Sequence, residues 1–421
     1  MKKIFLSFLL IFSSFLSFSQ DKGLDQKIDE AFAPISDFFS YYVFYPIAGY
    51  PFVILLLIGS AAFFTLYFGF PNIKYFFTAI NVVRGKYDEV EKDDSSSEDG
   101  EVSHFQALAT AVSGTVGNGN IAGVALAIAL GGPGATFWMV VCGLIGMSSK
   151  FVECTLGVQY RDVGEDGTIY GGPMYYLTKG LKEKGFETLG KVAAVFFAIF
   201  CIGGSFGGGN AAQSNQATIV LKQLLGLEST SAGAIIGLVL AILVGIIIIG
   251  GIKRIASVTE KVVPFMALLY LIACLYILLI NFSLIDDAIT LIIREAFNPT
   301  AVGVGGFIGV LMVGFKRAAF SNEAGVGSAS IAHSAVKTKY AASEGLVALL
   351  EPFIDTVVIC TMTALVIIIF NFGGYFEYGG DGLGTVMIDG MPFEGAGITS
   401  QAFAEYIPFS DIFLTIAVVL F

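Results

Sequence analysis

Charged residues are scarce in this chain of 421 residues. Asp, Glu, Lys and Arg make up 14% of it, while hydrophobic residues make up 55%. Soluble domains carry roughly 25% charged residues, so this chain has too few charges to cover one or two soluble domains. Its apolar excess also excludes a disordered chain. The class that remains is an all-α membrane protein with several crossings.

Histidine is nearly missing, and the cysteines form no motif. The only histidines are His104 and His333, which excludes a multi-histidine metal site. The five cysteines are scattered through apolar stretches without the short spacing of a zinc or redox motif, and they read as small core residues. The motifs HExxH and GxxxxGK[ST] do not occur, which argues against a zinc protease and an ATP-driven pump. The negative net charge of −11 argues against a nucleic-acid partner.

What the chain does have is a series of apolar stretches, each close to the ~20 residues that a bilayer crossing needs. A basic start and a short apolar run make 1–20 a signal peptide or signal anchor. Residues 21–49 are expected to form an outer amphipathic segment or a linker. The predicted crossings are 51–70, 105–129, 135–158, 192–213, 232–251, 258–281, 302–320, 345–372 and 399–421.

The distribution of Lys and Arg predicts the orientation. If residue 21 lies outside, the loops 71–104, 159–191, 252–257 and 321–344 lie inside. Of the 23 Lys and Arg, two precede the first apolar run, four lie in outer segments, and the other 17 lie in or beside the inner loops. This agrees with the positive-inside rule. The acidic segment 85–103 is expected to be a disordered cytoplasmic loop.

Two of the predicted crossings contain polar and glycine-rich interruptions. The first is SGTVGNGNIAG at 113–123, and the second is GFKRAAFSNEAGVGS at 314–328. Packing through small residues would explain the glycines of the first, and a capped helix end would explain the second. Irregular backbone at membrane depth otherwise survives only where it is buried in protein or lines a polar cavity.

Interrupted helices at corresponding places in two halves are typical of inverted-repeat secondary transporters, with the substrate between the halves. Half-helix N-termini suit a carboxylate, while unwound carbonyls with Asn and Thr oxygens suit Na⁺. We therefore expect an extra span plus acidic loop at 50–104, a first five-helix repeat at 105–281, and a second repeat at 302–421. Only three crossings fit the second repeat, so we expect a C-terminally incomplete version of a longer transporter.

Four segments resemble the alanine/glycine:cation symporter family of the amino acid–polyamine–organocation superfamily. They are TVGNGNIAGVALAIALGGPGATFWM (115–139), GGPMYYL (171–177), GGIKRIASVTEKVVPFMALLY (250–270) and SNEAGVGSASIAHSAVKT (321–338). The resemblance implies a leucine-transporter-like five-plus-five inverted repeat with one extra N-terminal span. It also implies Na⁺-coupled, less often H⁺-coupled, uptake of alanine or glycine across the bacterial inner membrane, with no cofactor besides the coupling ion.

The resemblance also implies site residues. Those expected to bind substrate are Thr115, Asn118, Gly119, Gln213 and Phe315, and those expected to bind the cation are Gly117, Asn120, Ser321 and Asn322. The family often has threonine where this chain has Asn118, whose larger side chain can still donate to a carboxylate. The amide oxygen of Gln213 could accept from the substrate ammonium.

Three acids lie in apolar surroundings, where ionisable groups are usually functional. Glu153 follows Lys150 by one helical turn, which favours an ion pair. Glu351 and Asp355 share one helix face, and we expect them in a structural network with Lys316 or Arg317, or in proton coupling.

Three functions remain open at this stage: a Na⁺-driven amino-acid symporter, the H⁺-driven equivalent, and a passive channel or facilitator. A channel would favour a repeated filter-like segment, and the sequence shows none.

Overall fold

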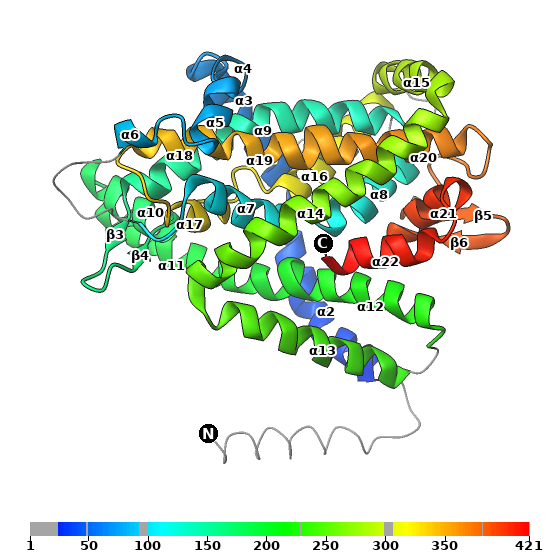
Figure 1. Ribbon diagram of the computed structural model, residues 1–421, viewed down its shortest axis with the longest axis horizontal. Coiled ribbons are helices and arrows are strands. Elements are labelled where there is room, and N and C mark those ends of the chain that lie inside the picture. Colours follow the sequence, from blue (N-terminus) through cyan, green and yellow to red (C-terminus); the bar gives the residue numbers. More distant parts are fainter. Residues whose placement is uncertain are drawn as a thin grey trace. The chain divides into compact units, whose positions relative to one another are not determined.

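The computed structural model describes residues 24–47, 49–91, 100–227, 230–298, 306–380 and 382–420. The predicted signal peptide or anchor at 1–20 lies outside these residues, as does the middle of the predicted acidic loop. The described chain is mostly helical (Figure 1). It divides into two compact units, Met1–Leu56 and Leu57–Phe421, which are described separately.

The described part of the first unit is a helix followed by a short hairpin. Helix α2 (Leu24–Val43) covers most of the predicted amphipathic segment or linker. Strands β1 (Pro46–Ile47) and β2 (Tyr50–Pro51) pair antiparallel, and α3 (Phe52–Tyr67) begins directly after them. The aromatic rings of α2 are exposed and contact one another, as Phe38 and Tyr42 do at 4.8 Å between ring centroids.

The second unit contains the remaining helices and two further hairpins. Its first half comprises α4 (Pro71–Lys74), α5 (Phe76–Val83), α6 (Asp88–Glu91), α7 (His104–Thr115), η2 (Gly119–Gly123), α8 (Val124–Gly131), α9 (Gly134–Gln159), β3 (Asp162–Val163), β4 (Ile169–Tyr170), α10 (Pro173–Glu183), α11 (Glu187–Gly204), η3 (Ser205–Ala211), α12 (Ala212–Leu225), α13 (Thr230–Ile248) and α14 (Gly251–Ile280).

Its second half comprises η4 (Phe282–Leu284), α15 (Ile285–Phe297), α16 (Gly306–Asn322), α17 (Ala329–His333), α18 (Ala341–Ala348), α19 (Leu350–Pro352), η6 (Phe353–Cys360), α20 (Thr361–Asn371), β5 (Val386–Ile388), β6 (Met391–Phe393), α21 (Ala396–Tyr406) and α22 (Ser410–Leu420). Strand β3 pairs with β4, and β5 pairs with β6, both antiparallel.

Four runs of described helix are long and apolar enough to cross a bilayer. They are Gly134–Gln159, Glu187–Lys222, Gly251–Ile280 and Ala341–Asn371. A fifth crossing is formed if α7 and the helix over Gly119–Gly131, which bend by 53° at their break, count as one span. Each falls on a predicted apolar stretch, so the chain has the pattern of a multi-pass membrane protein.

The predicted inner loop at 252–257 is wrong, because these residues belong to α14. The turn lies just before them, where Gly251 has a φ of +69°. Glycine adopts this left-handed conformation without the steric cost of a side chain. Lys253 and Arg254 therefore lie in the first turn of a helix, where their charges do not require a loop.

The predicted last crossing at 399–421 is also interrupted. Helix α21 ends at Tyr406 and α22 begins at Ser410. Pro408 explains the break, since proline has no N–H to donate and pushes the preceding residue out of the α region. Ile407 accordingly has extended backbone, with φ −117° and ψ 113°.

Two predicted outer loops contain regular structure. Residues 282–301 include helix α15, and residues 373–398 include the β5–β6 hairpin. The second segment lies over the end of the first broken crossing. Gly379 donates its N–H to the carbonyl of Ala129 at 2.7 Å. Just after the segment, the Thr399 hydroxyl of α21 donates to the carbonyl of Ile121 in η2 at 3.0 Å.

Helix α9 is the centre of the second unit and packs against α16, α18, α15 and α17. Small residues permit these close crossings, as is common between membrane helices. A Cβ on Gly345 of α18 would lie 1.9 Å from the Thr155 hydroxyl. A Cβ on Gly314 of α16 would lie 2.5 Å from the carbonyl oxygen of Ala135.

Gly314→Ala is expected to destabilise the protein by about 1–3 kcal/mol, because the new methyl group overpacks the α16–α9 contact. Thermal unfolding in detergent measures this as a lower midpoint. Gly237→Ala in α13 is the matched control, since a Cβ there meets nothing within 4 Å. Equal midpoints for the two variants would contradict the predicted role of Gly314.

Candidate functional site

The first break separates α7 from η2. Val116 ends α7 in an extended conformation, and the π-helix η2 begins at Gly119. The N–H of Gly117, freed by the break, donates to Asn120 Oδ1 at 2.7 Å. The N-terminal end of the helix over Gly119–Gly131 therefore faces the break with its partial positive charge.

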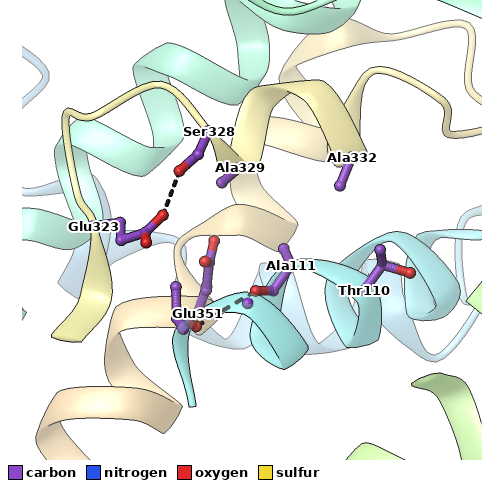
Figure 2. A pocket seen from close by; sticks show the side chains of 9 residues that line it. Thr110, Ala111, Glu323, Ser328, Ala329, Ala332 and Glu351 are labelled. Carbon is purple, nitrogen blue, oxygen red and sulfur yellow. Dashed lines mark hydrogen bonds between the residues drawn. The ribbon is translucent and has the colours of Figure 1, made fainter. Parts of the chain in front are cut away.

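The second break follows α16. Helix α16 ends at Asn322, the Glu323 N–H makes its last helical bond to the Ala319 carbonyl at 3.1 Å, and no helix resumes before Ala329. Glu323 has a φ of +50°, an uncommon backbone conformation for a residue with a side chain. Its carboxylate accepts a hydrogen bond from the Ser328 hydroxyl, which closes the loop on itself (Figure 2). The freed N–H of Ala324 donates to Asn322 Oδ1 at 3.0 Å.

The two breaks meet at Asp355 of η6. Asp355 Oδ1 accepts from Asn120 Nδ2 at 2.7 Å and from the Ser321 hydroxyl at 3.0 Å. Its Oδ2 accepts from the Thr356 hydroxyl at 2.7 Å, and its main-chain carbonyl accepts from Asn120 Nδ2 at 3.0 Å. All four residues are buried. A carboxylate and several neutral oxygens are thus gathered where candidate membrane spans meet.

A second polar contact joins the first break to α12. Gln213 Oε1 accepts from Asn118 Nδ2 at 2.7 Å and from the Asn118 main-chain N–H at 3.2 Å. Asn118 Oδ1 is buried and accepts no hydrogen bond. The oxygen of Gln213 is therefore engaged by Asn118, and the oxygen of Asn118 is an acceptor without a partner.

The other predicted site residues lie at different distances from this centre. A Cβ on Gly119 would lie 3.3 Å from the Ser321 hydroxyl, and Asn322 Nδ2 donates to the Thr356 hydroxyl at 2.9 Å, so both lie beside the Asp355 cluster. The Thr115 hydroxyl bonds carbonyls of its own helix. The ring of Phe315 packs against Trp138, with centroids 5.8 Å apart.

A buried ion network lies next to the cluster. Lys150 Nζ is 3.6 Å from Glu153 Oε1, the pair that the spacing predicts, and it donates to Glu351 Oε1 at 3.0 Å. The base that pairs with Glu351 is thus Lys150, rather than the expected Lys316 or Arg317. Glu153 Oε2 accepts from the freed N–H of Gly327, so this network also holds the second break.

Sequence reasoning placed Asp355 near the membrane core and missed its place between the breaks. Three π-helical segments were missed as well. Of these, η2 carries Asn120 and η6 carries Asp355. The third, η3, ends at Ala211, directly before α12, whose second residue is Gln213. Such segments are rare and frequently mark functional sites. The glycine-rich run at 113–123 gave a signal for η2, and the glycines at 203, 204 and 207–209 offered one for η3.

The chemistry available here is binding. No group of three or more His, Cys, Asp and Glu side chains suited to a metal ion occurs within the described ranges. The cluster offers one carboxylate, hydroxyls, an amide and a main-chain carbonyl, a donor set for a weakly bound hard cation. The Asn118–Gln213 contact offers two N–H donors to one acceptor. A helical membrane protein whose interrupted crossings meet in a buried polar centre belongs to the class of secondary transporters.

The particular family follows from sequence comparison. The profile of the "Sodium:alanine symporter family" matches residues 38–421, and the chain belongs to this family, whose members are transporters rather than enzymes. It is 41% identical over 372 residues to the sodium/alanine symporter AgcS of Methanococcus maripaludis, covering 88% of this chain and 76% of that protein.

Two relatives come from Bacillus subtilis. The amino-acid carrier protein AlsT is 38% identical over 339 residues, covering 80% of this chain and 66% of its own length. The putative sodium/proton-dependent alanine carrier protein YrbD is 38% identical over 373 residues, covering 88% of this chain and 72% of its own length. These relationships support amino-acid symport.

Gly117→Ala is expected to lower amino-acid uptake at least tenfold with little change in stability. The new Cβ would lie 2.8 Å from Gln213 Nε2 and would push the Gln213 side-chain amide away from Asn118. Because this amide is flexible and no backbone atom is displaced, stability should change little. Uptake into proteoliposomes and the thermal midpoint measure the two effects. Gly123→Ala is the control, since a Cβ there meets nothing within 4 Å. Normal uptake by Gly117→Ala would show that the Asn118–Gln213 contact is not needed.

Proposed function

We propose that this protein is a Na⁺-coupled symporter that carries small neutral amino acids, alanine or glycine, into the cell. Substrate binds at the first break and α12, through Thr115, Asn118, Gly119, Gln213 and Phe315. Na⁺ binds between the breaks, near Gly117, Asn120, Ser321 and Asn322, with Asp355 added from the geometry. The names of the relatives AgcS and YrbD support alanine as substrate and Na⁺ as coupling ion.

Support for an amino-acid carboxylate comes from the donors around Gln213 Oε1. Two N–H groups of Asn118, one of them main-chain, converge on this single oxygen. A substrate carboxylate oxygen could take the place of the amide oxygen and accept the same pair, more strongly because it is charged. The unpartnered Asn118 Oδ1 then supplies an acceptor for the substrate ammonium.

Support for Na⁺ comes from the Asp355 cluster, which is the single observation that carries the proposal. Asp355 is fully buried, and its two oxygens receive bonds only from neutral donors of Asn120, Ser321 and Thr356. A buried carboxylate without a positive partner is costly, and a monovalent cation would neutralise it. The same residues link both breaks, so ion binding would favour their closed arrangement.

Alternating access then follows from the architecture that we propose. The repeats are 105–281 and 302–421, related as in the leucine-transporter-like fold, with an extra span before them. The protein lies in the bacterial inner membrane with its mature N-terminus outside, as the bias of Lys and Arg suggests. Rocking of one part against the other around the cluster would open the site to each side in turn.

Uptake of radiolabelled alanine and glycine into proteoliposomes containing the full-length protein tests the coupling. An inward Na⁺ gradient is expected to drive accumulation above the external concentration, because ion and substrate bind together. Replacing Na⁺ with choline should abolish accumulation. Accumulation driven by a pH gradient alone would identify H⁺ as the coupling ion. Equilibration without accumulation would identify a passive facilitator.

Asn120→Ala is expected to reduce Na⁺-driven uptake at least tenfold, because it removes the bonds to Gly117 N–H and Asp355 Oδ1 together. The reduction should appear as a higher Na⁺ concentration for half-maximal uptake. Asn281→Ala is the control, since Asn281 Nδ2 bonds only the Ile277 carbonyl at the end of α14. An unchanged Na⁺ dependence in Asn120→Ala would contradict the assignment of the cation site.

A further inference from the structure

A separate cavity of about 120 Å³ lies beyond the Asp355 cluster, on the side toward the N-terminus of α7. Its polar lining is Thr110 and Thr115 of α7, Glu323 and Ser328 of the second break, and Glu351. Figure 2 shows Glu351 reaching into the space between α7 and the segment that carries Glu323 and Ser328. Since one water needs about 10–15 Å³, the cavity has room for an ion with several waters.

Glu351 supplies the feature that points to a ligand. Its side chain is fully buried, and Oε1 accepts from Lys150 Nζ at 3.0 Å. Its Oε2 has no hydrogen-bond partner and lies 3.8 Å from His333 Nε2. A buried carboxylate oxygen without a partner is costly, so a species that donates positive charge to it would be bound favourably.

The charge around the cavity is unbalanced in the same direction. Glu344 bonds the Nδ1 atoms of His104 and His333, the two histidines of the chain. Glu153 and Glu351 share Lys150, and Glu323 lines the same cavity as Glu351. These four carboxyl groups face at most three positive charges, even if both histidines are protonated. One further positive charge would balance the group.

The cavity is lined by the same chain segments that carry the proposed cation site. Glu351 precedes Asp355 by four residues in the same helical run, and Thr115 precedes the break that carries Asn120. An ion that leaves Asp355 toward the N-terminus of α7 would therefore meet Glu351 and Thr115 first. Carboxylate and hydroxyl oxygens are the ligands that a hard cation prefers.

We propose that this cavity binds a second Na⁺ ion, held by the carboxylates of Glu351 and Glu323 and by the hydroxyls of Thr110 and Thr115. The ion occupies a station on the route by which the coupling ion leaves Asp355 for the cytoplasm. This inference rests on the proposed function, which supplies Na⁺ as the coupling ion, Asp355 as its site and the cytoplasmic orientation of the N-terminus of α7. The Ser328 hydroxyl, at the other end of the loop, donates to the Glu323 carboxylate and so fixes its orientation for binding the ion.

Equilibrium binding of ²²Na⁺ to the purified full-length protein tests the station directly and needs no transport activity. Wild type is expected to bind one Na⁺ per protein more than Glu351→Gln or Glu323→Gln. Glu187→Gln, which changes an exposed glutamate of α11, should bind as wild type does. If both cavity variants bind as much Na⁺ as wild type, the station does not exist and the unpaired charge is met by a proton.

The two cavity variants differ in their risk of misfolding. Glu351→Gln removes the carboxylate that pairs with Lys150 and could fail to fold. The Glu323 side chain is half-buried, and glutamine there keeps an oxygen that accepts from Ser328. Glu323→Gln therefore decides the outcome where Glu351→Gln cannot be purified. Asp355→Asn should remove a different ion, and its combination with Glu323→Gln should remove two. If Asp355→Asn is the only variant that binds less Na⁺ than wild type, the second site does not exist and the proposed function still stands. If wild type binds no Na⁺, both proposals are wrong.

Discussion

Backbone groups that are freed where a membrane helix breaks must find partners inside the protein, because the bilayer offers none. Side-chain oxygens meet this requirement here at three positions. Asn120 caps the N–H of Gly117, Asn322 caps that of Ala324, and Glu153 caps that of Gly327. These side-chain oxygens of Asn120, Asn322 and Glu153 therefore stabilise the breaks themselves. Only the polar groups that do not cap the freed backbone are available to bind a ligand.

The same requirement ties the breaks to the scaffold. Glu153 can cap the second break because Lys150, on the same face of α9, lies 3.6 Å from its other oxygen. Lys150 also holds Glu351, one turn before Asp355. Removing a single partner from such a buried pair leaves an uncompensated charge and costs about 3–5 kcal/mol. Helix α9 is thus the fixed reference against which both breaks are positioned, which agrees with its many helix neighbours.

The sequence predicts the membrane class and the interruptions well, because apolar length and glycine with asparagine inside an apolar run have direct physical meanings. Residues 113–123 and 314–328 were expected to be irregular, and the helices do end at Thr115 and Asn322. Contacts between distant segments could not be read in the same way. The pairing of Lys150 with Glu351 depends on how α9 and α18 cross, through Gly345, and spacing along one chain does not contain it.

Other misses have local causes. The run at 399–421 is apolar throughout, so its composition predicts one crossing, yet Pro408 divides it. Residues 252–257 are basic enough to suggest a loop, yet the turn needs only Gly251. Asp355 was expected in a network with Lys316 or Arg317, and its actual partners were missed because Asn120 and Ser321 come from two other helices. The proposed site residues and repeat boundaries remain predictions for the transport and binding measurements.

The π-helical segments have a geometric consequence for how the centre is aimed. A π turn contains one residue more than an α turn, and each residue of an α-helix advances the direction of its side chain by about 100°. Asn120 in η2 and Asp355 in η6 thus point toward each other from helices whose flanking turns keep the ordinary register. Deleting one residue from η6 would swing everything from Thr361 to Asn371 around the helix axis. The side chains of α20, which are buried on all sides from Thr363 to Asn371, would then meet different neighbours, while length and hydropathy would stay nearly the same.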